Sequence, residues 1–214
     1  MKPILITLIL LTSLQSFGQF ARGNKFIGGT VDFDNRSYPD ISNSGNSSGT
    51  SISVYPSVGF LLNEKFAVGG QIGFSSYYSK FTNGSTYMAE SKSLYISTAI
   101  FAKRYFKISD KFLFSLVGTF AFNRGAITNT TTQPLIGLTV EDKSQNYIIY
   151  TSITPSFIFF PTPKWGFEVG IGSINHGYNS NLTTSQNSNS FQINYGRLSW
   201  GLSYYFRRSD QTIN

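Results

Sequence analysis

The sequence contains no cysteine and only one histidine, and 13% of its 214 residues are charged. The absence of cysteine excludes disulfides and thiol chemistry. No zinc-type His/Cys spacing, glycine-rich phosphate loop or calcium-loop pattern is present, so we expect no cofactor, no metal site and no catalytic residues. The charged share is about half that of an ordinary globular domain. After the N-terminus, no apolar run approaches the roughly 20 residues of a membrane-spanning helix.

Aromatic residues are abundant, with 20 Phe and 13 Tyr, and the chain also contains 20 Gly. An aromatic-rich, charge-poor and glycine-rich composition suits a β-structure that faces lipid. Lys and Arg total 17 against 10 acidic residues, a net charge of +7. The basic residues are scattered and form no basic helix, which favours contact with anionic lipid head groups over nucleic acid.

The N-terminus has the three parts of a secretory signal peptide. Met1-Lys2 supplies a positive start, Ile4–Leu11 is a short apolar core, and Ser16-Phe17-Gly18 places small residues at a cleavage site before Gln19. The apolar core is too short to span a bilayer as an anchor. The sequence therefore predicts a signal peptide over residues 1–18 and one exported domain over residues 19–214.

The stretch from Leu198 to Phe206 alternates strictly between large apolar and small side chains. Ser199, Gly201 and Ser203 occupy the positions between the large residues. A period of two is typical of a strand with one face in an apolar medium, and we predict the last strand of a barrel here, paired with the first strand near Phe26–Phe33. The large residues are Leu198, Trp200, Leu202, Tyr204 and Phe206.

Eight segments have the composition and length of strands that cross a membrane, and the connections between them alternate between long and short. This alternation predicts an all-β, eight-stranded antiparallel up-and-down transmembrane β-barrel, with long loops outside the cell and tight turns in the periplasm. The predicted long loops are Ser37–Thr50, Ser79–Glu90, Gly125–Lys143 and Tyr178–Ser190. The predicted strands are Lys25–Asp34, Ser51–Leu62, Phe66–Tyr78, Leu94–Phe106, Phe112–Arg124, Tyr147–Phe160, Trp165–Asn175 and Phe191–Phe206.

An internal repeat supports this arrangement, because Ile52–Phe74 aligns without a gap on Thr151–Ser173. Each unit carries a Lys-aromatic pair at its tight turn, and a third turn repeats the pair. We predict that the aromatic members, Phe66, Phe112 and Trp165, anchor the barrel at the membrane interface. Pro56 and Pro155 each remove a donor from the middle of a strand, and we predict a β-bulge there.

The alternation places apolar residues outside and small or polar residues inside. The predicted lumen carries few charges, of which Lys103, Glu168 and Arg197 form a candidate network, Glu168 pairing with Lys103 or Arg197. Asp32, Gln71 and Asn123 fall on the same face. An eight-stranded barrel is just wide enough for its side chains to fill it, so we expect a packed lumen; a gated polar path is the alternative.

His176 is predicted to lie in a surface loop. A histidine near the outer rim with serines close by resembles the lipid A deacylases, which are also small barrels. Their serine follows the histidine by two residues, and here that position is Tyr178. A lone histidine without a placed nucleophile and acid makes no catalytic triad.

The signal peptide, the two matching hairpins and the aromatic-ended strand together resemble the small outer-membrane β-barrels of the OmpA/OmpX-like type, without a peptidoglycan-binding domain. The resemblance implies a structural or surface-exposed binding or adhesion protein with no enzymatic activity, in the outer membrane of a Gram-negative bacterium. It further implies a monomer in contact with outer-membrane lipids, including lipopolysaccharide, and recognition of Leu198–Phe206 by the barrel assembly machinery. The ligand of the loops is unknown. The alternatives are a lipid A-modifying barrel enzyme and a narrow pore.

Overall fold

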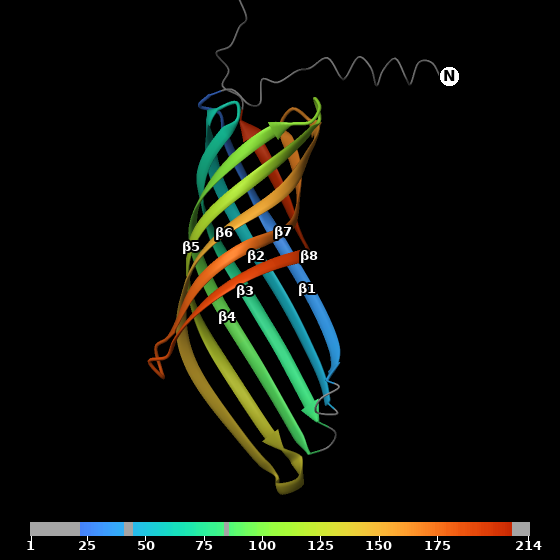
Figure 1. Ribbon diagram of the computed structural model, residues 1–214, viewed down its shortest axis with the longest axis vertical. Helices are drawn as coiled ribbons and strands as arrows, with labels where there is room; N and C mark the ends of the chain where they lie inside the picture. The colour runs from blue at the N-terminus through green and yellow to red at the C-terminus, as the bar shows by residue number, and fades with distance from the viewer. Residues whose placement is uncertain (1–21, 41–44, 84–85, 207–214) are drawn as a thin grey trace, which may run out of the picture.

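A computed structural model describes residues 22–40, 45–83 and 86–206, and it shows a closed antiparallel barrel in which neighbouring strands follow the order of the chain (Figure 1). The predicted signal peptide lies outside the described residues. A short 3-10 turn, η2 (Pro134–Ile136), separates β5 from β6. The eight strands are β1 (Lys25–Asp40), β2 (Gly45–Asn63), β3 (Phe66–Asn83), β4 (Tyr87–Lys107), β5 (Phe112–Gln133), β6 (Leu138–Thr162), β7 (Trp165–Asn181) and β8 (Asn187–Phe206).

The tight turns, the start of β1 and the end of β8 lie together at one end of the barrel, which we term the turn end. The opposite end is the hairpin end. At the turn end, the predicted strand limits agree with the structure to within two residues. At the hairpin end, the prediction of long irregular loops is wrong. Those segments continue as paired strands, so that Gln133 and Leu138 still face each other across the β5–β6 connection. These segments are rich in threonine, which is favourable in strands. Once a hairpin is in register, further pairing also supplies hydrogen bonds to its backbone N–H and C=O groups.

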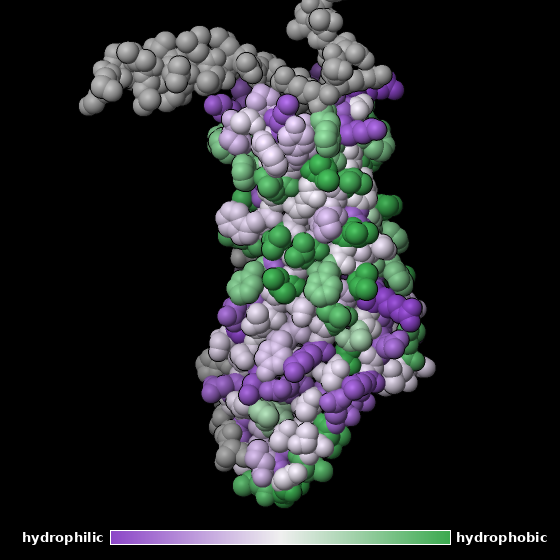
Figure 2. All heavy atoms as spheres, turned by 180° about the vertical axis from the view of Figure 1, so that it is seen from behind, coloured by the Kyte–Doolittle hydropathy of each residue, from purple (hydrophilic) through white to green (hydrophobic). Residues whose placement is uncertain are grey.

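The two faces of each strand match the predicted alternation. Large apolar side chains point outward and form a band around the barrel, which is visible from behind in Figure 2. An outward apolar face is stable only against an apolar medium, and this band is the lipid-facing belt of a transmembrane barrel. Its exposed members include Ile27, Val31, Phe33, Val54, Val58, Phe60, Ile72, Phe74, Leu94, Ile96, Ile100, Leu116, Phe120, Phe122, Ile153, Phe157, Phe167, Ile171, Leu198, Trp200 and Leu202.

Only one of the two mid-strand prolines lies at a bulge. The register of β6 with β7 shifts between Ile153 and Ser156, which flank Pro155. The register of β2 with β3 is the same on both sides of Pro56, so the predicted bulge is absent there. A second irregularity on β7 and β8, beside Gly172 with its φ of +122°, reverses which residues face outward along β8. The exposed residues are Phe191, Ile193 and Tyr195 before it and Leu198 and Trp200 after it.

The last strand closes the barrel against the first, as the sequence predicts, but over a shorter length. β8 pairs with β1 from Phe206 opposite Lys25 to Trp200 opposite Val31, and the pairing stops before Phe33. On its other side, β1 pairs with β2 along all 16 of its residues. The described residues contain no helix that is long and apolar enough to cross a membrane.

Candidate functional site

The lumen is closed at the turn end by a cluster of buried apolar side chains, which we term the plug. Phe26 packs its ring against Tyr205, with the ring centroids 5.2 Å apart, and the hydroxyl groups of Tyr105 and Tyr205 lie 3.4 Å apart. Every strand except β7 contributes to the plug. Its members are Phe26, Leu61, Ala67, Phe101, Tyr105, Leu113, Ile158, Phe160 and Tyr205.

Glycine provides the room for the plug. A Cβ atom at Gly59 would collide with the ring of Phe26, and one at Gly69 would collide with the ring of Phe101. These inward glycines let two large rings fit inside a barrel of only eight strands. Because Phe101 and Tyr105 have the same parity as Lys103, the alternation already assigns them to the inside, but their clustering into a plug was not predicted.

The repeated Lys-aromatic turns support the plug directly. The backbone carbonyls of Lys65, Lys111 and Lys164 accept hydrogen bonds from the backbone N–H groups of Tyr105, Phe160 and Tyr205, each at 2.8 Å. Each tight turn therefore holds one plug aromatic of a neighbouring strand. This shared contact gives the sequence repeat a structural role.

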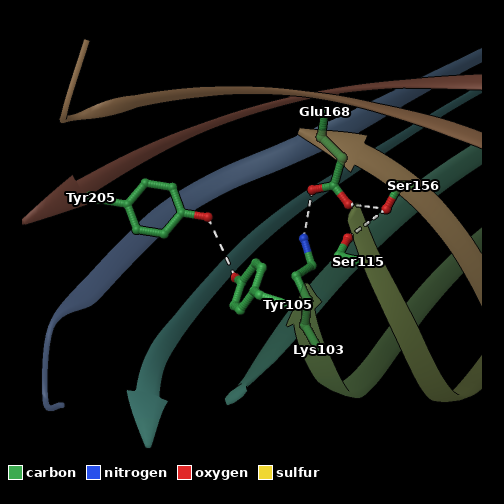
Figure 3. A network of polar contacts seen from close by, with 6 residues as sticks. All are labelled: Lys103, Tyr105, Ser115, Ser156, Glu168 and Tyr205. Carbon is green, nitrogen blue, oxygen red and sulfur yellow. Dashed lines mark hydrogen bonds and ion pairs between the residues drawn. The ribbon is translucent and has the colours of Figure 1, made fainter. Parts of the chain in front are cut away.

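An ion pair lies next to the plug inside the barrel (Figure 3). Lys103 Nζ donates to Glu168 Oε2 at 2.5 Å, and Ser156 Oγ donates to Glu168 Oε1 at 2.6 Å. The hydroxyl oxygens of Ser115 and Ser156 are 2.8 Å apart. Both charged side chains are nearly buried.

Of the two partners considered for Glu168 from the sequence, Lys103 is the one that contacts it in the structure. The side chain of Arg197 lies outside the described part of the chain, so its predicted membership of the network stays a prediction. Both carboxylate oxygens of Glu168 are engaged, and a buried charge that is paired and hydrogen-bonded is a strong cross-link between strands. The pair joins β4 to β7 across the interior and stiffens this end of the lumen. We term the plug and the ion pair together the floor of the lumen.

Beyond this floor, the lumen is hollow. A cavity of about 570 Å³ extends toward the hairpin end, and its wall carries hydroxyl and amide groups from every strand except β4, including Thr30, Tyr55, Gln71, Thr119 and Ser152. The prediction of a packed lumen is therefore wrong for the middle of the barrel. Glycine, serine and threonine at most inward positions are too small to fill it.

Asp32, Gln71 and Asn123 line this cavity, as their parity predicts. Within the described part of the chain, Asn123 Oδ1 and the buried Ser97 Oγ have no hydrogen-bond partner from the protein. Buried polar atoms are usually satisfied by protein, water or ligand. Asn123, which lines the cavity, therefore leaves an acceptor oxygen available to a polar molecule held there.

The three predicted anchor aromatics occupy equivalent places, since Phe66, Phe112 and Trp165 begin β3, β5 and β7. Phe112 stacks on Phe159 with ring centroids 4.8 Å apart, and Trp165 meets Tyr204 edge to face at 5.0 Å. Aromatic rings at both ends of a belt are typical of barrel interfaces. Their role as membrane anchors stays a prediction.

His176 lies within β7 between Thr151 and Phe191 of the neighbouring strands, and its side chain is exposed. The prediction of a loop histidine is therefore wrong, because the β7–β8 hairpin continues as paired strand past this residue. No group of three or more His, Asp or Glu side chains able to hold a metal ion occurs among residues 22–40, 45–83 and 86–206.

The most exposed apolar cluster at the hairpin end was not predicted. The β5–β6 connection presents Leu135 and Ile136, which are 74% and 68% exposed, and Leu138 and Val140 follow on β6. The predicted loop Gly125–Lys143 is polar on average, and this average hid the apolar tip. The signal in the sequence was the local pattern Pro-Leu-Ile-Gly-Leu, which follows a run of three threonines.

No family model matches this chain, and no curated protein matches it. Solved structures match at low sequence identity. The attachment invasion locus protein Ail of Yersinia pestis is 15% identical with a TM-score of 0.38, over 86% of this chain and 99% of that one. Neisserial surface protein A is 15% identical with a TM-score of 0.45, over 85% and 97%. The outer membrane protein OprG of Pseudomonas aeruginosa is 12% identical with a TM-score of 0.37, over 89% and 99%.

Proposed function

We propose that this protein is a surface-binding barrel of a Gram-negative outer membrane, which contacts its partner through the hairpin end and conducts no solute. In barrels of this type the tight turns face the periplasm and the longer connections face outward. The turn end is accordingly periplasmic, and the β5–β6 tip is the part of the barrel presented to the surroundings.

The length of the β5–β6 hairpin supports a binding role. β5 has 22 residues and β6 has 25, whereas about ten residues suffice for a tilted strand to cross the membrane. The excess builds a two-stranded arm that projects beyond the other strands at the bottom of Figure 1. A rigid paired arm presents its tip at a fixed distance from the membrane.

The observation that carries the proposal is the apolar tip of this arm. Leu135 and Ile136 stand on η2, and Figure 2 shows apolar side chains again at the far end of the molecule, beyond a polar zone. Exposed apolar patches that are rimmed by polar residues mark contact sites. The tip therefore is the candidate for adhesive contact, in place of the polar loop surface expected from composition.

The closed floor argues against conduction. The plug and the Lys103–Glu168 pair lie across the lumen at the turn end. A pore needs a continuous polar route, and here the route ends at packed aromatic rings.

Adhesion of cells that display the protein tests the proposal. Cells with the double variant Leu135→Asn/Ile136→Asn should bind polystyrene beads several-fold less than wild type, at equal surface expression. The matched control is Thr131→Asn/Thr132→Asn on the same arm, which should bind like wild type. Equal adhesion by all three proteins would reject the tip as the contact.

The lipid A-modifying alternative has its own test. His176 is the one histidine of the chain, and it faces outward from β7. Mass spectrometry of lipid A from cells with and without the protein should give identical species. A shift of the mass by one acyl chain would favour an enzyme over a binding protein.

A further inference from the structure

The contact between β1 and β8, which we term the seam, is hydrogen-bonded over only part of its length. Seven residue pairs join the two strands, from Lys25 with Phe206 to Val31 with Trp200. Beyond Val31, β1 pairs only with β2, and beyond Trp200, β8 pairs only with β7, among the described residues. In Figure 1 the β7–β8 hairpin bends away from β1 toward the opposite side of the molecule.

The opening begins at the level of the lipid. Six steps along a strand tilted by about 40° rise roughly 16 Å, whereas the apolar belt of such barrels is about 25 Å tall. Exposed apolar side chains continue above the last pair, with Phe33 on β1 and Leu198 and Ile193 on β8. The upper part of the belt, which corresponds to the outer leaflet, therefore borders the open seam.

The luminal cavity reaches this seam from inside. Its lining includes Thr30 and Asp32 on β1 and Ser199 and Gln192 on β8, so both edges of the opening belong to the cavity wall. Below, the plug and the Lys103–Glu168 pair close it. The cavity is therefore polar, closed at the turn end, and open at its side toward the hydrocarbon of the membrane. We term it the cup.

We propose that this cup binds an amphiphile from the outer leaflet, whose uncharged, hydroxyl-rich head group occupies the cavity and whose alkyl chain leaves through the β1–β8 seam. Unpaired strand edges beside lipid are costly, and a bound head group at the opening supplies hydrogen-bond partners for them. The volume of about 570 Å³ is in the range of small-molecule sites and suits a sugar-sized head group.

The lining selects the charge and chemistry of the head group. Hydroxyl and amide side chains such as Thr119, Gln71 and Asn123 both donate and accept hydrogen bonds, which matches a polyol. The lysine and glutamate of the lining, Lys103 and Glu168, are paired with each other, and the hydroxyl and amide groups carry no charge, which favours an uncharged head group. The inference depends on the barrel and its seam, and it is independent of the adhesive role of the β5–β6 tip.

NMR of the protein in nanodiscs of deuterated phospholipid tests the proposal, with dodecyl maltoside as the added amphiphile and maltose as the head group alone. Dodecyl maltoside should saturably shift the side-chain amide signals of Gln71 and Asn123. Its alkyl protons should give contacts concentrated at Phe33 and Trp200. Thr119→Trp, which fills the cavity, should abolish the saturable shifts, whereas Thr98→Trp, which adds the same ring to the lipid-facing surface of β4, should preserve them.

Three results would overturn the proposal. Equal shifts with maltose would mean a cup for water-borne solutes. Alkyl contacts spread evenly over the belt, for example to Val58 and Ile100 as much as to Phe33, would mean ordinary lipid contact. Saturable shifts that persist in Thr119→Trp would place the amphiphile outside the lumen.

Discussion

The turn-end half and the hairpin-end half of this barrel are built from the same eight strands, but they are organised differently. At the turn end the ring is closed on all sides, and aromatic and aliphatic side chains fill it. Toward the hairpin end β1 and β8 separate, the lumen is hollow, and the strands continue as polar hairpins. The buried packing of this narrow barrel is therefore concentrated at the turn end, and the hairpin end is open and solvated.

The largest expected difference between the halves concerns assembly. Phe206 closes the ring opposite Lys25, whereas Phe120 lies in the middle of β5; their side chains are 49% and 51% exposed. Phe206→Ala should reduce the folded fraction in the outer membrane severalfold, because the last strand both closes the ring and resembles the assembly signal. Phe120→Ala should assemble almost normally.

Heat-modifiable gel migration of the outer-membrane fraction measures the folded share of both variants. Equal assembly would mean that β8 behaves as an ordinary strand. A wild-type protein that migrates identically with and without boiling would count against the barrel itself.

Breaking the ion pair at the floor comes next in size. Glu168→Ala leaves the Lys103 ammonium group nearly buried without its partner, and it should lower the free energy of unfolding by about 3–5 kcal/mol. Urea unfolding in lipid vesicles measures the loss. The double variant Lys103→Met/Glu168→Leu removes both charges and should recover most of it.

The same Glu168→Ala variant should stay closed to ions, because the plug aromatics remain in place. Conductance in planar bilayers should equal that of wild type. A large increase would show that the ion pair, and not the plug, blocks the lumen.

A matched pair of leucines compares packing at the two ends. Leu61 is 1% exposed in the plug, and Leu135 is 74% exposed at the hairpin tip. Leu61→Ala should lower the free energy of unfolding by about 2–5 kcal/mol, because it leaves a cavity. Leu135→Ala should change it by less than about 0.5 kcal/mol. Equal losses in urea unfolding would mean that the tip contributes to the core.

The smallest expected effect is electrostatic and lies beyond the belt. Tyr78 Oη donates to Glu90 Oε1 at 3.0 Å and Lys80 Nζ lies 3.5 Å from the same oxygen. The hydrogen bond from Tyr78, followed by the charge of Lys80, lowers the pKa of Glu90 below its ordinary value. The stabilisation is therefore present above the unfolded-state pKa of a glutamate, and it is lost as the pH falls through the lower folded-state value.

An NMR titration of the Glu90 carboxyl carbon measures this shift. Tyr78→Phe removes the donor and should move the pKa of Glu90 upward, toward the ordinary value. A midpoint that does not change would mean that the hydrogen bond does not form in solution.

Between irregularities, period-two alternation was sufficient to predict which residues face lipid, because each inward or outward assignment there depends only on the local pleat. It did not predict the irregularity beside Gly172, which reverses the outward face along β8. It placed Lys103 and Glu168 inside, and the need of a buried charge for a partner then predicted that Glu168 pairs with Lys103 or Arg197. The structure shows the pair with Lys103. The turn-end limits were equally predictable, since each turn carries a short polar segment followed by an aromatic residue. The hairpin-end limits were not, because polar β-branched runs suit a solvated loop and a solvated strand equally well.

The sequence by itself determined the number of strands, their faces, the tight turns and the first half of the closing seam. Only the tertiary structure decided where the lumen is full and where it is hollow, because filling depends on which inward side chains from different strands meet at one level. It likewise decided where β1 and β8 part, since pairing between the two ends of the chain depends on the accumulated register and bulges of all eight strands. Local sequence patterns do not report these accumulated register shifts, and the cavity that opens between β1 and β8 results from them.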